Sequence, residues 1–215
     1  TASGLSTAGA ADDAPPIKVG LIGCGGRGRG AMMDCFHSSP NVKIVALADL
    51  FQDWLNDARK VLADNSIQVE DGRCHVGFDA YKRVLDSDVD LVLLATPPGF
   101  RPIHFPAAID AGKHVFMEKP VAVDPPGCRK VIEAGELAKQ KKLSIVMGAQ
   151  RRHSKGYRMT AKAVQEGAIG KIRGGSIYWC GGALWRRGKE GKWNDAEYLV
   201  RNWVSFAGMS GDHIV

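Results

Sequence analysis

The sequence lacks several features that would point to particular classes of protein. No apolar run approaches the roughly 20 residues that a helix needs to cross a bilayer, so we expect no membrane span. The five cysteines include no C-x-x-C pair and are odd in number, which argues against a closed disulfide framework and favours structural thiols. None of the six histidines pairs with another at a spacing typical of a metal site, so no metal is expected.

The charge of the chain is only modestly unbalanced, at a net +6. Basic residues gather at 139–142, at Arg151 and Arg152, and between Arg186 and Lys192. Such clusters are either solvated faces or sites that attract an anionic cofactor or substrate. Because no nucleic-acid-binding motif accompanies them, we expect no nucleic-acid partner.

Residues 1–16 differ in composition from the rest, with small residues followed by acidic residues and proline. The triplet Ala8-Gly9-Ala10 fits an A-x-A cleavage signal, but a charged n-region and a long apolar segment are absent. The stretch is therefore either the remnant of an export leader or an ordinary flexible N-terminus. The first alternative predicts a periplasmic or exported protein, and the second a cytoplasmic one.

From residue 17 to about residue 150, apolar strands alternate with helices, which predicts a parallel sheet covered on both faces. The expected architecture is a doubly wound α/β domain of Rossmann type over residues 17–150. The expected strands are Ile17–Ile22, Val42–Ala48, Cys74–Val76, Val89–Ala95, His114–Met117 and Leu143–Met147. The expected helices between them are Ala31–His37, Gln52–Ala63, Ala80–Leu85, Ile103–Ala111 and Pro126–Lys141.

The pattern changes after residue 150. A helix is predicted over Tyr157–Glu166 and a strand over Lys171–Trp179, followed by a polar stretch rich in tryptophan. Residues 151–215 therefore predict the beginning of a second domain that is incomplete in this chain.

The most informative motif is a glycine loop that directly follows the first strand. Gly23, Gly25 and Gly28 have the spacing G-x-G-x-x-G, and a helix follows them. In a dinucleotide-binding domain the first glycine permits a tight turn, the second lets the backbone approach a pyrophosphate, and the third lets helix and strand pack closely. The N–H groups at the start of the helix then face the phosphates.

An acidic residue, Asp49, follows the second strand at the distance that this motif requires. A carboxylate there accepts hydrogen bonds from the adenosine ribose and repels a 2′-phosphate, which favours NAD over NADP. Arg27 and Arg29 can offset a phosphate charge, so NADP is the alternative cofactor. The alternative role for Asp49, considered without the glycine loop, is a helix N-cap.

Ligands of open parallel sheets bind beyond the carboxyl ends of the strands, where this sequence places Thr96, Pro97, Glu118 and Lys119. Lys119 is the main catalytic candidate. A lysine held near a nicotinamide ring can give a proton to a reacting hydroxyl or take one from it, and the positive charge of the oxidised ring lowers the lysine pKa. The alternative is a solvated surface lysine.

The sequence resembles the Gfo/Idh/MocA oxidoreductases from Ile17 to its last residue. Four segments carry the resemblance: the glycine loop, Ala48-Asp49, Ala95-Thr96-Pro97 with His104 downstream, and Ala111-Gly-Lys-His-Val-Phe-Met-Glu-Lys-Pro120. The resemblance implies a Rossmann domain followed by a mostly antiparallel sheet domain. That second domain carries the substrate site and often an oligomer interface, so we expect a homo-oligomer of the full-length protein.

The resemblance also implies roles for individual residues. Lys119 corresponds to the catalytic lysine, its bond to Pro120 is expected to be cis, and Glu118 helps to position the nicotinamide end of the cofactor. Arg152 is expected to face the substrate cleft. Arg201 and Trp203 lie where members of the family often place groups that face the substrate.

The chain departs from the family pattern near its end. Ser210-Gly-Asp-His-Ile-Val215 resembles the opening of a motif in the second domain, with Asp212 in place of the second glycine. The acid and the histidine that later follow in that motif lie beyond residue 215. We therefore expect the chain to be the N-terminal part of a longer enzyme and to be inactive by itself.

Three functions follow from these patterns. The main hypothesis is an NAD(P)-dependent oxidoreductase that transfers a hydride between nicotinamide and a sugar, sugar derivative or cyclitol. The second is a glycosidase that uses NAD catalytically, by transient oxidation and elimination. The third is a non-catalytic dinucleotide-binding sensor or structural relative.

Overall fold

The computed structural model describes residues 15–178 and 180–211. Residues 1–14 of the expected leader, together with Asp212 and His213, lie outside the described residues. Within the described part, no helix combines the length and the apolar character needed to cross a membrane.

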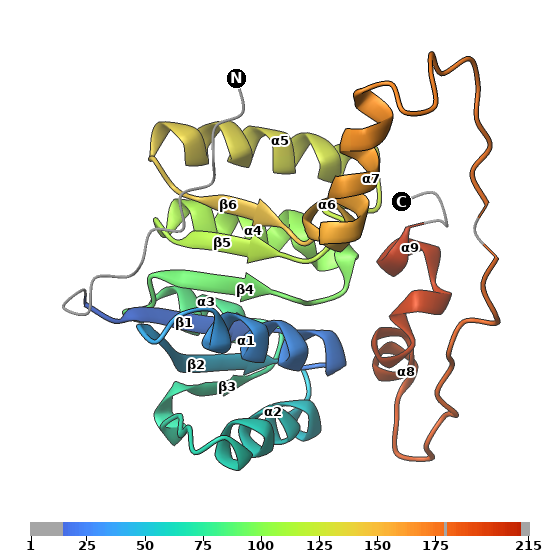
Figure 1. Ribbon diagram of the computed structural model, residues 1–215. Helices are drawn as coiled ribbons and strands as arrows, with labels where there is room; N and C mark the ends of the chain where they lie inside the picture. The colour runs from blue at the N-terminus through green and yellow to red at the C-terminus, as the bar shows by residue number, and fades with distance from the viewer. Residues whose placement is uncertain (1–14, 179, 212–215) are drawn as a thin grey trace.

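The core of the protein is a six-stranded parallel sheet with the order β3-β2-β1-β4-β5-β6 (Figure 1). This order confirms the Rossmann-type fold, because the chain steps outward from β1 in one direction and then crosses to the other side at β4. The strands are β1 (Ile17–Ile22), β2 (Val42–Asp49), β3 (Cys74–Val76), β4 (Leu91–Leu94), β5 (His114–Met117) and β6 (Ile145–Met147).

Helices cover the sheet on both faces and enclose two apolar clusters. The helices are α1 (Gly26–Ser38), α2 (Gln52–Asp64), α3 (Ala80–Leu85), α4 (Arg101–Asp110) and α5 (Pro125–Gln140), with short 3₁₀ turns at Asp71–Arg73 and Pro98–Phe100. Successive residues of β1 face opposite sides. Leu21 packs with Met32 and Leu55 of α1 and α2, whereas Ile22 packs in the cluster that holds Phe105 of α4.

Most of the expected elements are confirmed, and several with their bounds unchanged: Ile17–Ile22, Cys74–Val76, Ala80–Leu85 and His114–Met117. Two expected strands are shorter, because β4 begins at Leu91 rather than Val89 and β6 begins at Ile145 rather than Leu143. Val89 is buried all the same. Its apolar side chain reaches the core from the residues that precede the strand. The expected strand began too early because an apolar residue can be buried without being part of a strand.

The rest of the chain leaves the sheet and returns to it. Helices α6 (Gln150–His153) and α7 (Lys155–Gln165) lead into an extended stretch. The chain then comes back beside the carboxyl ends of the strands, where it forms α8 (Asp195–Arg201), a 3₁₀ turn (Trp203–Ser205) and α9 (Ala207–Ser210) (Figure 1).

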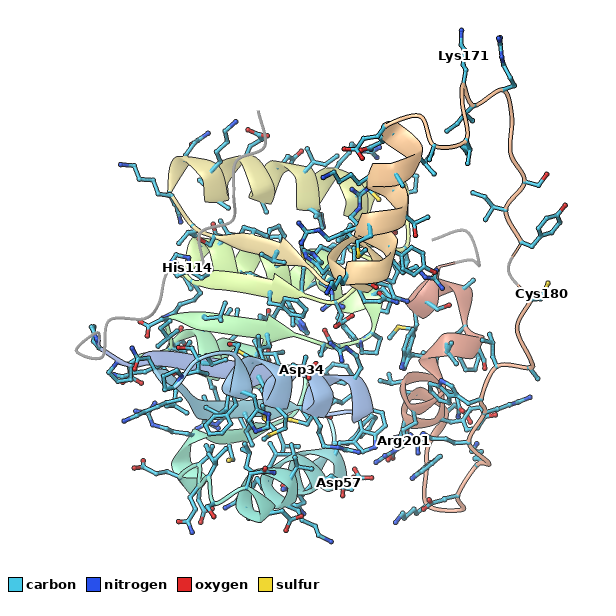
Figure 2. All side chains as sticks on the ribbon, in the orientation of Figure 1. Asp34, Asp57, His114, Lys171, Cys180 and Arg201 are labelled. Carbon is cyan, nitrogen blue, oxygen red and sulfur yellow. The ribbon has the colours of Figure 1, made fainter. Side chains whose placement is uncertain are left out.

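The strand expected over Lys171–Trp179 was wrong for the described residues 171–178, which have no regular structure and are all exposed. Figure 2 shows this stretch, around Lys171, standing away from the sheet. No described strand lies beside it to complete its backbone hydrogen bonds.

Candidate functional site

The glycine loop between β1 and α1 has the tight geometry that its spacing predicts. Gly23 has a φ of +101°, and a Cβ added to it would lie 2.6 Å from the backbone nitrogen of Thr96. A Cβ on Gly28 would lie 1.8 Å from the carbonyl oxygen of Gly23. By contrast, a Cβ on Gly25 would meet only Trp54, at 4.0 Å. The first and third glycines are thus required by protein contacts, and the second leaves open space above the backbone.

Asp49, the last residue of β2, is buried and holds the glycine loop in place through a hydrogen bond to its backbone. Its Oδ2 accepts a hydrogen bond of 2.6 Å from the Cys24 N–H, and its Oδ1 accepts one of 2.8 Å from the Phe51 N–H. Burial raises the pKa of Asp49 to about 6, although the backbone N–H groups oppose that shift. Asp49 is not an N-cap, since the residue that precedes α2 is Phe51.

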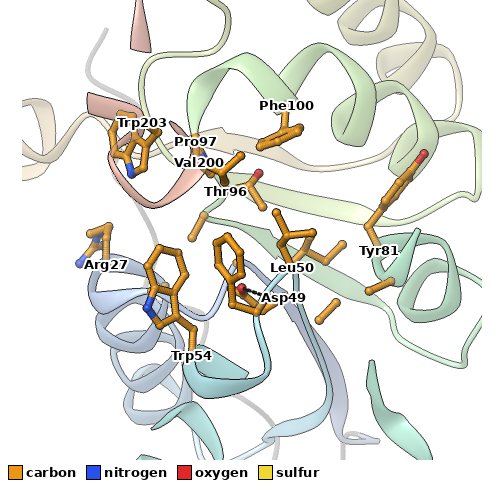
Figure 3. Close-up of a pocket in the computed structure, with 18 of the residues that line it drawn as sticks. Arg27, Asp49, Leu50, Trp54, Tyr81, Thr96, Pro97, Phe100, Val200 and Trp203 are labelled. Carbon is orange, nitrogen blue, oxygen red and sulfur yellow. Dashed lines mark hydrogen bonds between the residues drawn. The ribbon is translucent and has the colours of Figure 1, made fainter. Parts of the chain in front are cut away.

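A cavity of about 420 Å³ opens between the glycine loop and the ends of β2 and β4. Figure 3 shows Trp54, Arg27 and Trp203 along one side of the cavity and Tyr81 on the opposite side. All the predicted cofactor-binding residues except Glu118 line it, namely Gly23, Gly25, Arg27, Gly28, Asp49, Thr96 and Pro97. The glycine spacing and the strand ends therefore converge on one place.

His104 of α4 also lines this cavity and is buried. Its Nδ1 lies 3.1 Å from the Thr96 hydroxyl oxygen, and its ring stacks on Phe100 with centroids 5.8 Å apart. Burial, helped by the charge of Arg101, lowers the pKa of His104 to about 4. The imidazole is therefore neutral near pH 7 and braces the end of β4.

Arg101 is a component of the site that the sequence patterns did not reveal. It is fully buried at the start of α4, where its Nη1 donates to the Leu94 carbonyl at 2.6 Å and its Nη2 to the Thr96 carbonyl at 2.9 Å. Burial lowers its pKa to about 10, although nearby Glu118 opposes the shift. One sequence signal could have revealed Arg101. It is a charged residue within the apolar pattern of the helix that follows Thr96-Pro97, and such a residue is a candidate for a buried cation with hydrogen-bond partners nearby.

We expect Arg101→Met to lower the free energy of unfolding by about 2–4 kcal/mol, because two hydrogen bonds from a charged donor are lost and the Thr96 carbonyl loses its partner. Denaturant unfolding followed by circular dichroism measures the change. Arg83→Met, at an exposed position on α3, is the matched control and should change stability little. Equal stability of the two variants would contradict this role of Arg101.

Glu118 and Lys119 follow β5 at the edge of a second and larger cavity, of about 1100 Å³. Glu118 is buried and accepts a 2.6 Å hydrogen bond from Arg27 Nε, so that the glycine loop and the end of β5 are joined. Lys119 is exposed, and its peptide bond to Pro120 is cis, as the resemblance implied. Arg27 and Thr96 line both cavities, which are therefore neighbours.

The three predicted substrate residues lie in different surroundings. Arg152 is exposed on α6 and does not line either cavity. Arg201 is buried and pairs with Asp53 and Glu197. Trp203 lines both cavities. Their contact with substrate stays a prediction.

The residues around the smaller cavity fit a dinucleotide. The space above Gly25 admits a phosphate group close to the backbone, and the first turn of α1 begins at Gly26. Each Asp49 oxygen accepts one backbone N–H and keeps capacity for a ribose hydroxyl. In the described part of the chain, no group of three or more His, Cys, Asp or Glu side chains is arranged to hold a metal ion.

Comparison with known proteins gives the same result for the fold and the cofactor. A family model described as an oxidoreductase family with an NAD-binding Rossmann fold, Gfo/Idh/MocA, matches residues 17–149. Inositol 2-dehydrogenase of Pseudomonas fluorescens (strain SBW25) is 34% identical over 155 residues, which are 72% of this chain and 43% of that protein. The chain thus spans less than half the length of the curated relatives that it matches.

Solved structures are similar over the same part. The structure of scyllo-inositol dehydrogenase from Lactobacillus casei with bound NAD(H) and scyllo-inositol has a TM-score of 0.60 at 27% identity, over 73% of this chain and 43% of that chain. A 3-ketoreductase from Actinomadura kijaniata in complex with TDP-benzene and NADP has a TM-score of 0.58 at 26% identity, over 74% of this chain and 46% of that chain.

Proposed function

This chain belongs to the Gfo/Idh/MocA oxidoreductase family with its NAD-binding Rossmann fold, and from that premise we propose that the whole protein oxidises a carbinol of a cyclitol or sugar. The observation that carries the proposal is the meeting of three strand ends. The glycine loop after β1 and Asp49 at the end of β2 line one cavity, and Lys119 after β5 lines the neighbouring one. The similarity to inositol 2-dehydrogenases favours a cyclitol within the class of polyols.

Each residue has a distinct part in the proposed reaction. The N–H groups around Gly25 and the start of α1 bind the cofactor phosphates, and Asp49 accepts hydrogen bonds from a ribose. When bound, a nicotinamide cofactor would supply the acceptor or donor of the hydride. The Lys119 side chain, in the adjacent cavity, would hydrogen-bond the substrate hydroxyl; as a neutral amine it would accept the hydroxyl proton during oxidation, and as an ammonium group it would return that proton during reduction. Glu118, held by Arg27, positions the nicotinamide end.

The proposal is tested by assaying the full-length protein with NAD and a panel of myo-inositol, scyllo-inositol and common hexoses. We expect stoichiometric formation of NADH with at least one polyol. Absence of NADH with every member of the panel, in a protein that binds NAD, would contradict the dehydrogenase reaction.

A homo-oligomeric state and an exported location are further predictions. Light scattering of the full-length protein tests the first, and fractionation of cells tests the second.

The raised pKa of Asp49 predicts that NAD binding depends on pH. Above a pH of about 6 the carboxylate is ionised and accepts hydrogen bonds from the ribose, whereas below it the protonated acid loses part of that capacity. We therefore expect the Kd for NAD to rise as the pH falls from 7 to 5. His104, whose pKa is lowered to about 4, stays largely neutral over this range.

Calorimetric titration at several pH values measures this dependence. Asp49→Asn should make the affinity weak and nearly independent of pH. Asp57→Asn is the control, because Asp57 is an exposed carboxylate on α2. This variant should keep the pH dependence of NAD binding seen in the wild type. A flat profile in the wild type would contradict the role of Asp49.

A further inference from the structure

The smaller cavity is not built by the Rossmann domain alone. Four of its lining residues come from the returning chain, which we call the C-terminal segment and define as residues 183–211: Trp185, Arg187, Val200 and Trp203. Trp185 and Trp203 contact each other edge to face, with ring centroids 6.3 Å apart. A part of the chain far from the glycine loop in sequence thus forms one wall of the site.

Arg201 fastens this segment to the Rossmann domain. Its Nη1 and Nη2 donate to the two carboxylate oxygens of Asp53 at 2.8 and 3.0 Å, and its Nε donates to Glu197 at 2.9 Å. Its guanidinium carbon lies 3.9 Å from the centroid of Phe51, which also lines the cavity. A bidentate pair that is stacked on an aromatic ring holds the segment in one geometry.

A second contact places Arg187 at the cavity. Asn202 is fully buried, and its Oδ1 accepts a 2.6 Å hydrogen bond from the Arg187 N–H. The guanidinium carbon of Arg187 lies 5.6 Å from the ring of Trp54 and 5.5 Å from the ring of Trp185. Among the described residues, no carboxylate lies within ion-pair distance of Arg187.

This cation stands close to the place where the phosphates are expected. Trp54 lies 4.0 Å from a Cβ built on Gly25, so that Gly25, Trp54 and Arg187 form a continuous series of neighbours along one side of the cavity. An arginine without an acidic partner, held at the mouth of an anion-binding loop, has the geometry and charge to bind a phosphate through two parallel hydrogen bonds.

We propose that Arg187 is a ligand of a cofactor phosphate and that the C-terminal segment forms the outer wall of the dinucleotide site. This inference rests on the proposed function, because it needs a dinucleotide in the cavity. Asn202 and the Arg201–Asp53 pair are positioning contacts that hold Arg187 over the loop. The phosphate is either the pyrophosphate of both dinucleotides or the 2′-phosphate of NADP, and these share the chemistry that an arginine recognises.

The test is calorimetric titration of NAD and NADP into the full chain and into Arg187→Gln. The matched control is Arg186→Gln, since Arg186 is the adjacent arginine, donates to the Tyr198 hydroxyl at 2.8 Å and does not line the cavity. We expect Arg187→Gln to weaken binding roughly 10- to 100-fold, the range for one lost hydrogen-bonding contact to a charged group. Arg186→Gln should bind as the wild type does, and Arg187→Lys should recover part of the affinity.

The pattern across the two cofactors identifies the phosphate. Equal weakening for NAD and NADP assigns Arg187 to the pyrophosphate, and weakening for NADP alone assigns it to the 2′-phosphate. Equal affinity of Arg187→Gln and Arg186→Gln for both dinucleotides would overturn the inference while leaving the proposed function standing. A wild-type chain that binds neither dinucleotide would overturn both.

The positioning contact gives an independent measurement. Asp53→Asn removes the charge that fixes Arg201 but leaves Arg187 intact. Stopped-flow displacement should show that NAD dissociates several-fold faster from this variant than from the wild type. An unchanged dissociation rate in Asp53→Asn would contradict the part assigned to the Arg201–Asp53 pair.

Discussion

Lys119→Met in the full-length protein is expected to reduce kcat for polyol oxidation by roughly 10²–10⁴-fold, the range for loss of a positioned acid or base. NAD affinity should be unchanged, because Lys119 lines the larger cavity and not the one that holds the glycine loop. Steady-state kinetics and NAD titration together separate the two effects. The methionine side chain keeps most of the length of lysine and removes only the proton-transfer group.

Lys130→Met is the matched control for this experiment, since Lys130 is an exposed lysine on α5 and lines neither cavity. It should retain the kcat of the wild type. Undiminished turnover in Lys119→Met would remove Lys119 from the reaction, and a parallel loss of NAD affinity would indicate that it serves the cofactor instead.

Gly28→Ala should abolish dinucleotide binding even though it adds a single methyl group. The new Cβ would lie 1.8 Å from the Gly23 carbonyl oxygen, which is backbone and cannot rotate away. The loop must therefore move, and with it the N–H groups that face the phosphates. We expect a loss of affinity of at least roughly 100-fold, which corresponds to about 2.7 kcal/mol, and a fall in the free energy of unfolding of about 3 kcal/mol.

Gly135→Ala is the control for the glycine experiment. Gly135 lies within α5, and a Cβ added there meets nothing within 4 Å. It should keep the affinity of the wild type and gain slightly in stability, because alanine favours a helix more than glycine does. Titration with NAD and denaturant unfolding measure both quantities. Wild-type affinity in Gly28→Ala would contradict the tight packing of this loop.

The sequence was sufficient to predict the parts of the fold that rest on local pattern. Buried parallel strands are apolar throughout, and the helices between them have clear ends, so that the alternation and most bounds were predictable. The spacing of Gly23, Gly25 and Gly28 and the position of Asp49 located the cavity, because the carboxyl ends of neighbouring parallel strands meet at one edge.

The residues that the sequence did not reveal depend on packing between distant segments. Arg101 resembles any charged residue near a helix start until the fold brings the Leu94 and Thr96 carbonyls to its guanidinium. Arg187 was part of a basic cluster with two open interpretations, and only its contact with Trp54 places it at the cavity. The alternation over Lys171–Trp179 predicted a strand. Alternation shows only that one face of a segment could be buried, and among the described residues no strand lies beside 171–178 to pair with it.

The most direct test of the central claim is calorimetric titration of NAD into the wild-type chain and into Gly28→Ala, with circular dichroism confirming that both are folded. We predict saturable binding of one NAD per chain in the wild type and none in the variant. Binding of equal strength in both proteins would place the dinucleotide elsewhere. Failure of the folded wild type to bind either NAD or NADP would contradict the assignment of the cavity beside the glycine loop as a dinucleotide site.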